Sequence, residues 1–342
     1  MMNYEEFKEY VKENIINALP NQYAEFEVSI RKSMKNNGLE LDGLCIHGHD
    51  SISPVIYLNG YYEKYNDGEP LGSILSDISE TYTEHMQHRT IPSDVLELVQ
   101  DIDHAKEHIH SRLVNTKNNP MMLEGRPHTN FEDLSITYHI EVSRDDSGMA
   151  SIPITNELAE GLGVTAEDLE KIAVENMPRN NPMVFRNMMD VVKDMIIPDL
   201  MDDGMSKEQA ESMFEDMFQV ENEKMFVLSN DTATNGAIWM TRPEALEEIS
   251  ERVGGDYFVL PSSIHEVIIV ADLKFDKDAL QDMVISVNQG QVRPEERLSD
   301  NVYAYDSKEH KLSLVTGDRD ITHEKNQELV QEEEKKHSSM KH

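Results

Sequence analysis

The chain has 342 residues, of which 66 are acidic and 31 basic, so its formal net charge at pH 7 is −35. A charge of this sign repels nucleic-acid phosphates and anionic lipid, which argues against direct binding to either. The one cysteine, Cys45, excludes an internal disulfide and a cysteine-rich zinc site.

Targeting and membrane signals are missing from the sequence. The first ten residues contain neither a basic region nor an apolar core, so no secretion signal or transit peptide is expected. No apolar run approaches the roughly 18–20 residues that a membrane span requires. We therefore expect a cytoplasmic protein with enough residues for two domains.

The first 90 residues predict a small unit of mixed structure. Helical spacing of apolar residues over 4–19 predicts a helix that ends at Pro20. Alternating runs on either side of Asn36-Asn37-Gly38 predict a β-hairpin over 26–33 and 39–46. Apolar stripes predict two further helices, over 55–65 and 71–82.

A polar stretch rich in charge and histidine follows, and we interpret residues 85–119 as one or two connecting helices. The predicted organisation is therefore an N-terminal unit over 1–90, a polar helical connector over 91–120, a C-terminal domain over 121–318 and a disordered polar tail over 319–342.

The C-terminal domain begins with a predicted hairpin, 134–142 with 149–154, around an Asp-Asp-Ser-Gly turn. Ser206 opens a capping box, and Pro178 and Pro198 are expected to stop two helices. Predicted helices cover 155–161, 169–177, 182–197, 208–218, 243–253 and 277–288. Predicted strands cover 225–229, 237–241, 257–260 and 266–271, with a final hairpin of 302–305 and 312–315.

These elements predict an α+β protein in two parts. The small N-terminal part contains a helix, a hairpin and further helices. The larger C-terminal domain contains an antiparallel or mixed sheet, which we expect helices to pack on one face.

Several motifs spread along the chain carry a family resemblance. They are Lys35-Asn36-Asn37-Gly38, Asn119-Pro120-Met121, Val174-Glu175-Asn176-Met177-Pro178, Leu260-Pro261-Ser262-Ser263-Ile264-His265-Glu266-Val267 and Leu298-Ser299-Asp300-Asn301-Val302-Tyr303. Over about residues 4–316 the chain resembles a bacterial family catalogued only as a domain of unknown function. The C-terminal half is loosely similar to a second uncharacterised bacterial family. Neither resemblance implies a reaction or a cofactor; the first implies accessory roles near mobile elements.

Ser263, His265 and Glu266 form a sequence cluster that contains a hydroxyl, a base and an acid. Such groups could support nucleophilic attack, with His265 taking the serine proton. No Gly-x-Ser-x-Gly elbow precedes Ser263, and triads usually assemble from separate loops. A Pro-Ser-Ser turn that satisfies backbone groups is the competing interpretation.

Two histidine pairs are candidate metal ligands. If residues around 104–108 are helical, His104 and His108 lie one turn apart on one face, as paired zinc ligands do. His47 and His49 would share a face of a continuing strand, with Asp50 next to them. A solvated helix and ordinary loop histidines are the competing interpretations, and we expect no bound cofactor.

Methionines concentrate between Met183 and Met225, with phenylalanines interleaved. Methionine side chains are flexible and suit surfaces that accept varied partners, although a loosely specified helical core gives the same pattern. We therefore expect a non-enzymatic interaction or accessory protein with a protein partner. The alternatives are a hydrolase-like or metal-dependent enzyme, which uses His265 and Glu266 or a histidine cluster, and an acidic DNA mimic.

Overall fold

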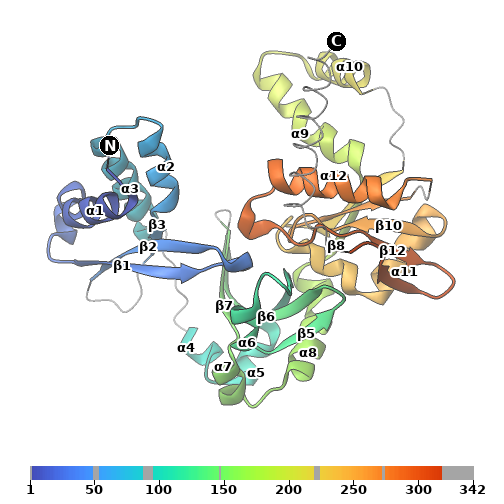
Figure 1. Cartoon of the computed structure of the whole chain (residues 1–342), viewed down its shortest axis with the longest axis horizontal. Helices are drawn as coiled ribbons and strands as arrows, with labels where there is room; N and C mark the ends of the chain where they lie inside the picture. Colours follow the sequence, from blue (N-terminus) through green and yellow to red (C-terminus); the bar gives the residue numbers. More distant parts are fainter. Residues whose placement is uncertain are drawn as a thin grey trace, which may run out of the picture. The chain divides into compact units, whose positions relative to one another are not determined.

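A computed structural model describes residues 2–48, 54–87, 95–145, 148–218, 224–271 and 274–317. Helices and antiparallel sheets make up the described chain, which confirms the predicted α+β class (Figure 1). The chain divides into two compact units. Unit 1 is Met1–Asn130, Leu134–Asn180 and Pro294–Glu296; unit 2 is Phe131–Asp133, Asn181–Arg293 and Arg297–His342. The tail predicted as disordered lies outside the described residues.

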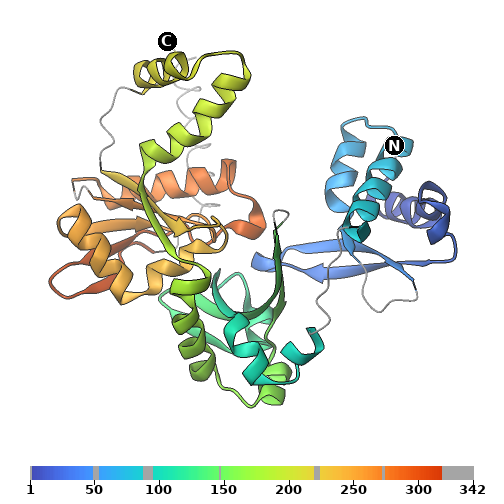
Figure 2. The ribbon, with the colours of Figure 1, turned by 180° about the vertical axis from the view of Figure 1, so that it is seen from behind.

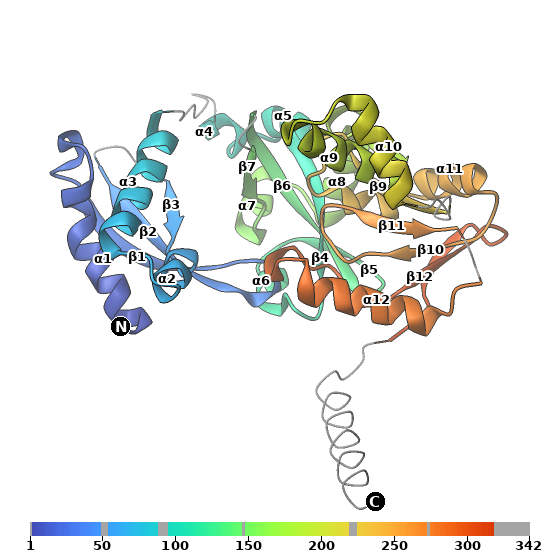
Figure 3. The same ribbon diagram turned by 90° about the horizontal axis from the view of Figure 1, so that it is seen from above.

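Unit 1 begins with a three-stranded antiparallel sheet in the order β1-β2-β3. Helices α1 and α3 pack on it, as Figure 3 shows, and bury Phe7, Ile15 and Ile78 against Leu44 and Ile46 of β2. The elements are α1 (Tyr4–Ala18), η1 (Asn21–Tyr23), β1 (Glu27–Met34), η2 (Asn36–Gly38), β2 (Glu40–His47), β3 (Val55–Tyr57), α2 (Asn59–Asn66) and α3 (Leu71–Gln87).

The predicted hairpin is confirmed, and its turn explains the Asn-Gly pair. Asn37 and Gly38 both have positive φ, 60° and 68°, the conformation that Asn and Gly adopt most readily. The helix predicted over 55–65 is wrong in its first turn, because Val55–Tyr57 pairs with β2 and the helix starts only at Asn59.

A second sheet in unit 1 has β6 at its centre, paired with β4 on one side and with β5 and β7 on the other. Helix α8 covers one face, where Met177 Sδ accepts the Ser111 hydroxyl at 4.0 Å. The elements are α4 (Val95–Leu98), α5 (Ile102–Ala105), η3 (Lys106–His108), β4 (Ile109–Asn115), α6 (Pro120–Glu124), β5 (His128–Phe131), β6 (Leu134–Asp145), β7 (Gly148–Pro153), α7 (Asn156–Leu162) and α8 (Ala166–Asn180).

The connecting helix predicted over 85–119 is wrong for Ile109–Asn115, which forms β4. The physical reason is tertiary: seven consecutive residues of β4 pair with β6, and this ladder overrides the local helical preference. β4 and β6 therefore pair across the domain boundary that the sequence predicts at residue 120.

Unit 2 is built on a six-stranded antiparallel sheet in the order β13-β12-β10-β11-β9-β8. Its elements are β8 (Met183–Asn187), α9 (Met188–Asp202), α10 (Lys207–Met217), β9 (Met225–Asn230), η4 (Gly236–Thr241), α11 (Pro243–Val253), β10 (Tyr257–Leu260), β11 (Val267–Val270), α12 (Lys277–Gly290), β12 (Tyr303–Asp306) and β13 (Lys311–Leu314). The short turn η5 (Pro294–Glu296) clusters with unit 1.

Helices cover both faces of this sheet, so the expectation of helices on one face only is wrong. Leu260 of β10 packs with Leu280 and Val284 of α12. The side chain of Tyr257, three residues earlier and on the opposite face, donates its hydroxyl to the Leu246 carbonyl of α11 at 3.0 Å. No helix in the described part of the chain is long and apolar enough to cross a membrane.

Three further predictions in this region need correction. β8 occupies the start of the helix predicted over 182–197, and η4 replaces the strand predicted over 237–241. Pro178 and Pro198 lie inside the last turns of α8 and α9 instead of ending these helices. Each proline removes one N–H donor from its helix, yet α8 continues for two residues past Pro178 and α9 for four past Pro198. The capping box at Ser206 is confirmed.

The partly buried carboxylate of Asp133 holds the last hairpin of unit 2. Asp133 accepts hydrogen bonds from the Tyr303 hydroxyl, from Ser299 Oγ at 2.7 Å and from Asn301 Nδ2 at 2.9 Å. Burial, followed by the nearby Asp133 charge, raises the pKa of Tyr303 far above its usual value, so this hydroxyl stays a donor. One carboxylate therefore satisfies three donors of unit 2.

Asp133→Ala is expected to lower the free energy of unfolding of unit 2 by about 2–4 kcal/mol, because three donors lose a charged acceptor. Urea unfolding followed by the fluorescence of Trp239, the one tryptophan of the sequence, measures this loss. Adding Tyr303→Phe to Asp133→Ala should recover part of the loss, since it removes an unpaired hydroxyl. A single variant as stable as the wild type would contradict this account.

Candidate functional site

Ser263, His265 and Glu266 lie together between β10 and the start of β11. The buried Ser263 Oγ accepts the backbone N–H of His265 at 3.0 Å. His265 Nδ1 in turn accepts the backbone N–H of Asn235 at 3.2 Å. A nucleophilic serine would instead donate to the imidazole. The contacts are those of a turn that satisfies backbone donors, and catalysis by these residues stays a prediction.

His47 ends β2, and its Nε2 lies 2.7 Å from the Ser29 hydroxyl on the paired strand. His49, its predicted partner in a metal site, lies outside the described residues. A metal site at this strand end therefore stays a prediction.

His104 and His108 do not share a helix. α5 ends at Ala105, and His108 belongs to the 3-10 turn before β4. His104 Nδ1 lies 3.1 Å from Asp101 Oδ2, whereas His108 lines a pocket of about 340 Å³ with Glu107, Glu141, Arg179 and Asn180. Over the described ranges, no group of three or more His, Cys, Asp or Glu residues could hold a metal ion.

The methionine-rich stretch forms a helical hairpin, residues 188–217, which we call the α9–α10 arm. Figure 2 shows α9 leading away from β8, with α10 folded beside it. Ile197 of α9 and Ala210 and Phe214 of α10 form a small buried cluster of their own. Lys193 and Glu211 join the two helices by an ion pair of 3.7 Å. The arm therefore has its own small core.

Four methionines of the arm are exposed instead of filling this core. The exposed fractions are 67% for Met195, 44% for Met201, 39% for Met213 and 56% for Met217. Nine acidic and only two basic residues accompany them between residues 188 and 217. The arm therefore presents flexible apolar side chains on an acidic background, and the structural-core interpretation accounts for only part of the methionine pattern.

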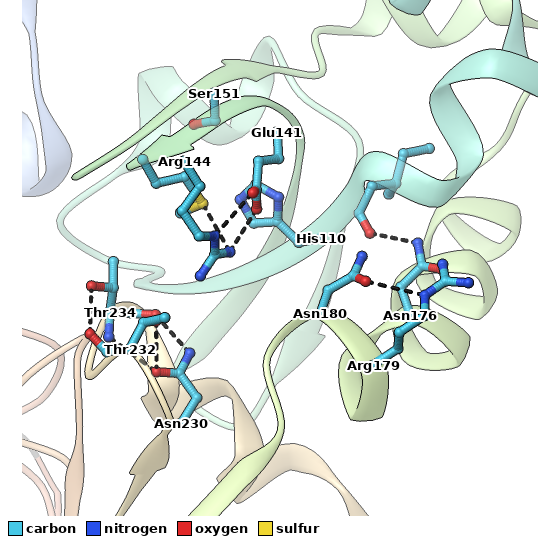
Figure 4. Close-up of polar contacts among 12 residues, drawn as sticks. His110, Glu141, Arg144, Ser151, Asn176, Arg179, Asn180, Asn230, Thr232 and Thr234 are labelled. Carbon is cyan, nitrogen blue, oxygen red and sulfur yellow. Dashed lines mark hydrogen bonds and ion pairs between the residues drawn. The ribbon is translucent and has the colours of Figure 1, made fainter. Parts of the chain in front are cut away.

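The sequence analysis missed a polar sheet face in unit 1. β4 and β6 pair so that His110 lies opposite His139 and Arg112 opposite Thr137. The two imidazole rings stack at 5.7 Å, with 4% of His110 and 7% of His139 exposed. The face also carries Glu141, whose carboxylate is paired with Arg144 (Figure 4). In the sequence, Ile109, Ser111 and Leu113 alternate with His110 and Arg112. This alternation is the signal that could have revealed the polar face.

The polar face strongly perturbs its titratable groups. Burial, reinforced by the Arg112 charge, lowers the pKa of His110 to about 3 and that of His139 well below its usual value. Burial, followed by the charge of Arg126, lowers the pKa of Arg112 to about 10. Both imidazoles are therefore neutral in the folded protein, while Arg112 remains a cation at neutral pH.

Comparison with known proteins gives one match. The model of a family of unknown function, DUF5688, matches residues 4–307. No curated protein and no solved structure matches the chain. The looser resemblance of the C-terminal half to a second family stays a prediction.

The free energy of unfolding is expected to fall as the pH drops below about 6.5, because the unfolded chain protonates His110 and His139 and the folded chain does not. Each such group contributes a slope of about 1.4 kcal/mol per pH unit. His139→Gln should therefore flatten the dependence that urea unfolding, followed by circular dichroism, shows between about pH 5 and about pH 6.5. His85→Gln, at an exposed histidine, is the control; equal slopes for wild type and His139→Gln would contradict the prediction.

Proposed function

The chain belongs to the family of unknown function DUF5688, and we propose that it is a non-enzymatic interaction protein whose α9–α10 arm binds a basic amphipathic helix of a protein partner. The observation that carries this proposal is the set of exposed methionines on a helical hairpin with its own small core.

Exposed methionines suit this role because their unbranched side chains adjust to an incoming surface. Met213 and Met217 are four residues apart on α10 and therefore lie one helical turn apart on one side. Met205 and Phe218, which flank α10, are partly buried against the small cluster of Ile197, Ala210 and Phe214. An amphipathic helix can lay its apolar stripe on such a surface, with anchor residues at similar spacing.

The charge of the arm selects the kind of helix. Its nine acidic residues would repel an acidic partner and attract a basic one, which favours fast encounter and discriminates between partners. Arg186 of β8 already pairs with Asp194, and Lys193 of α9 already pairs with Glu211. The remaining carboxylates are available to cations of a partner.

The alternative functions have weaker support. A hydrolase-like or metal-dependent enzyme would use His265 and Glu266 or a histidine cluster, but Ser263 and His265 contact backbone N–H groups, and His104 and His108 do not share a helix. No observation favours an acidic DNA mimic. We place the interaction in the cytoplasm, as the sequence predicts.

A synthetic Leu/Lys amphipathic peptide of about 20 residues is long enough to cover the arm and tests the proposal. Fluorescence anisotropy should show binding that weakens in about 0.5 M salt, where surface charges are screened. The double variant Met213→Gln/Met217→Gln should raise the Kd by about thirtyfold, or about 2 kcal/mol, because two apolar contacts are lost.

The matched control is Met283→Gln on α12, which changes an exposed methionine of unit 2 outside the arm. It should leave the Kd unchanged, and circular dichroism should show that all variants remain folded. A Leu/Glu peptide of the same design should not bind. Equal affinity of the wild type and the double methionine variant would reject the arm as the docking surface.

A further inference from the structure

The polar sheet face of unit 1 has the opposite charge to the protein as a whole. Arg112 of β4 and Arg144 of β6 lie on it, and Arg126 is close enough for its charge to act on Arg112. Glu141 pairs with Arg144 at 2.6 Å. Within the described ranges, no carboxylate lies within ion-pair distance of Arg112 or Arg126. A partly buried guanidinium without a counter-charge is destabilising. The chain has 66 acidic residues, so its composition offers many acids that could pair with it.

The hydrogen bonds of Arg112 determine which atoms of the face remain unsatisfied. Its Nε donates to His110 Nε2 at 3.3 Å, and its Nη2 donates to Ser151 Oγ at 2.6 Å. Because Nε can only donate, His110 Nε2 must accept, and the neutral ring therefore carries its proton on Nδ1. Among the described residues, no acceptor lies within normal hydrogen-bond distance of this buried Nδ1–H. The face thus presents an unused N–H donor next to an unpaired cation.

His139 adds a second unsatisfied atom. Its buried Nδ1 also has no hydrogen-bond partner in the described part of the chain, while its Nε2 lies 3.4 Å from the Thr137 hydroxyl. Buried polar atoms in folded proteins are nearly always hydrogen-bonded, so two such atoms on neighbouring rings indicate a missing ligand. Arg126 and Ser151 at the margin of the face are only partly buried, which leaves an approach from the surface.

The sign of the local charge decides what kind of ligand fits. A pair of imidazoles could suggest a metal ion, but the Arg112 guanidinium donates directly to His110 Nε2, and a cation beside it would be repelled. An oxyanion reverses this interaction, since it accepts from His110 Nδ1–H and pairs with the guanidinium. Two unpaired arginines match a doubly charged group better than a single carboxylate.

We propose that the polar sheet face of unit 1 binds a phosphate group, which is held by Arg112 and His110 and further neutralised by Arg126. The group belongs either to free phosphate or to a small phosphomonoester, because the structure shows contacts for the phosphate alone. This site is independent of the α9–α10 arm, which lies in unit 2.

Inorganic phosphate and methyl phosphate are the probes, titrated into the full-length chain at constant ionic strength with sodium chloride as reference. Thermal unfolding and 31P NMR should show that the wild type binds phosphate, with a rise in the unfolding temperature that chloride does not produce. Tighter binding of methyl phosphate than of phosphate would assign the group to a phosphomonoester, and the reverse would assign it to the free ion. Acetate that binds as tightly as phosphate would overturn the assignment.

Arg112→Met separates a ligand site from a purely structural arginine. The substitution removes a partly buried charge without an ion-pair partner among the described residues, so the variant should be at least as stable as the wild type without phosphate. Its Kd for phosphate should rise at least tenfold, because a charged donor is lost. Arg126→Gln should also weaken phosphate binding, and carries the test if Arg112→Met does not fold. Arg186→Met, at an arginine paired with Asp194, is the matched control and should retain the phosphate response.

Two results would overturn the proposal. One is an unfolding temperature of the wild type that millimolar phosphate raises no more than chloride does. The other is a folded Arg112→Met or Arg126→Gln variant with the phosphate affinity of the wild type. A direct check of the donor is the 15N signal of His110, where phosphate should shift Nδ1 more than Nε2.

Discussion

The antiparallel pairing of β4 with β6 is the constraint on which the architecture of unit 1 depends. It sets Ile109, Leu113 and Ile136 on the face that α8 covers, and His110, Arg112 and His139 on the other. A slip of one residue would exchange the two faces of a strand and expose its apolar side chains. Asn176 of α8, labelled in Figure 4, secures the start of β4, since its Nδ2 donates to the Lys106 and Ile109 carbonyls at 2.7 and 2.8 Å. The strand pairing that builds this core therefore also places Arg112 on the opposite face of the sheet.

Elements with strong local signals could be predicted from the sequence, and elements defined by their partners could not. α1, the hairpin around Asn37 and Gly38, and the capped start of α10 each combine periodicity with a turn or cap residue. β4 and β8 are strands of seven and five residues that directly precede or follow helical segments. Their residues become strand only because β6 and β9 offer ladders, and that information is not local.

The same distinction applies to the candidate sites. Proximity in sequence suggested Ser263 with His265 and His104 with His108, but the contacts of His265 come from Asn235, thirty residues away, and a turn separates the two other histidines. His110 and His139 are 29 residues apart and meet only through strand register. The methionine pattern was informative because its residues are contiguous in the sequence and fold into one helical hairpin.

The distribution of charge gives the two units different electrostatic characters. The carboxylates of the α9–α10 arm are mostly exposed, so water solvates them and salt screens them within about 10 Å. Arg112 is only partly exposed, so its field is screened less than that of a fully solvated charge. A chain with a net charge of −35 could easily have supplied an acid to pair with Arg112. Glu141 instead pairs with Arg144, and Asp194 pairs with Arg186. The proposed phosphate would supply the counter-charge of Arg112 from outside the polypeptide.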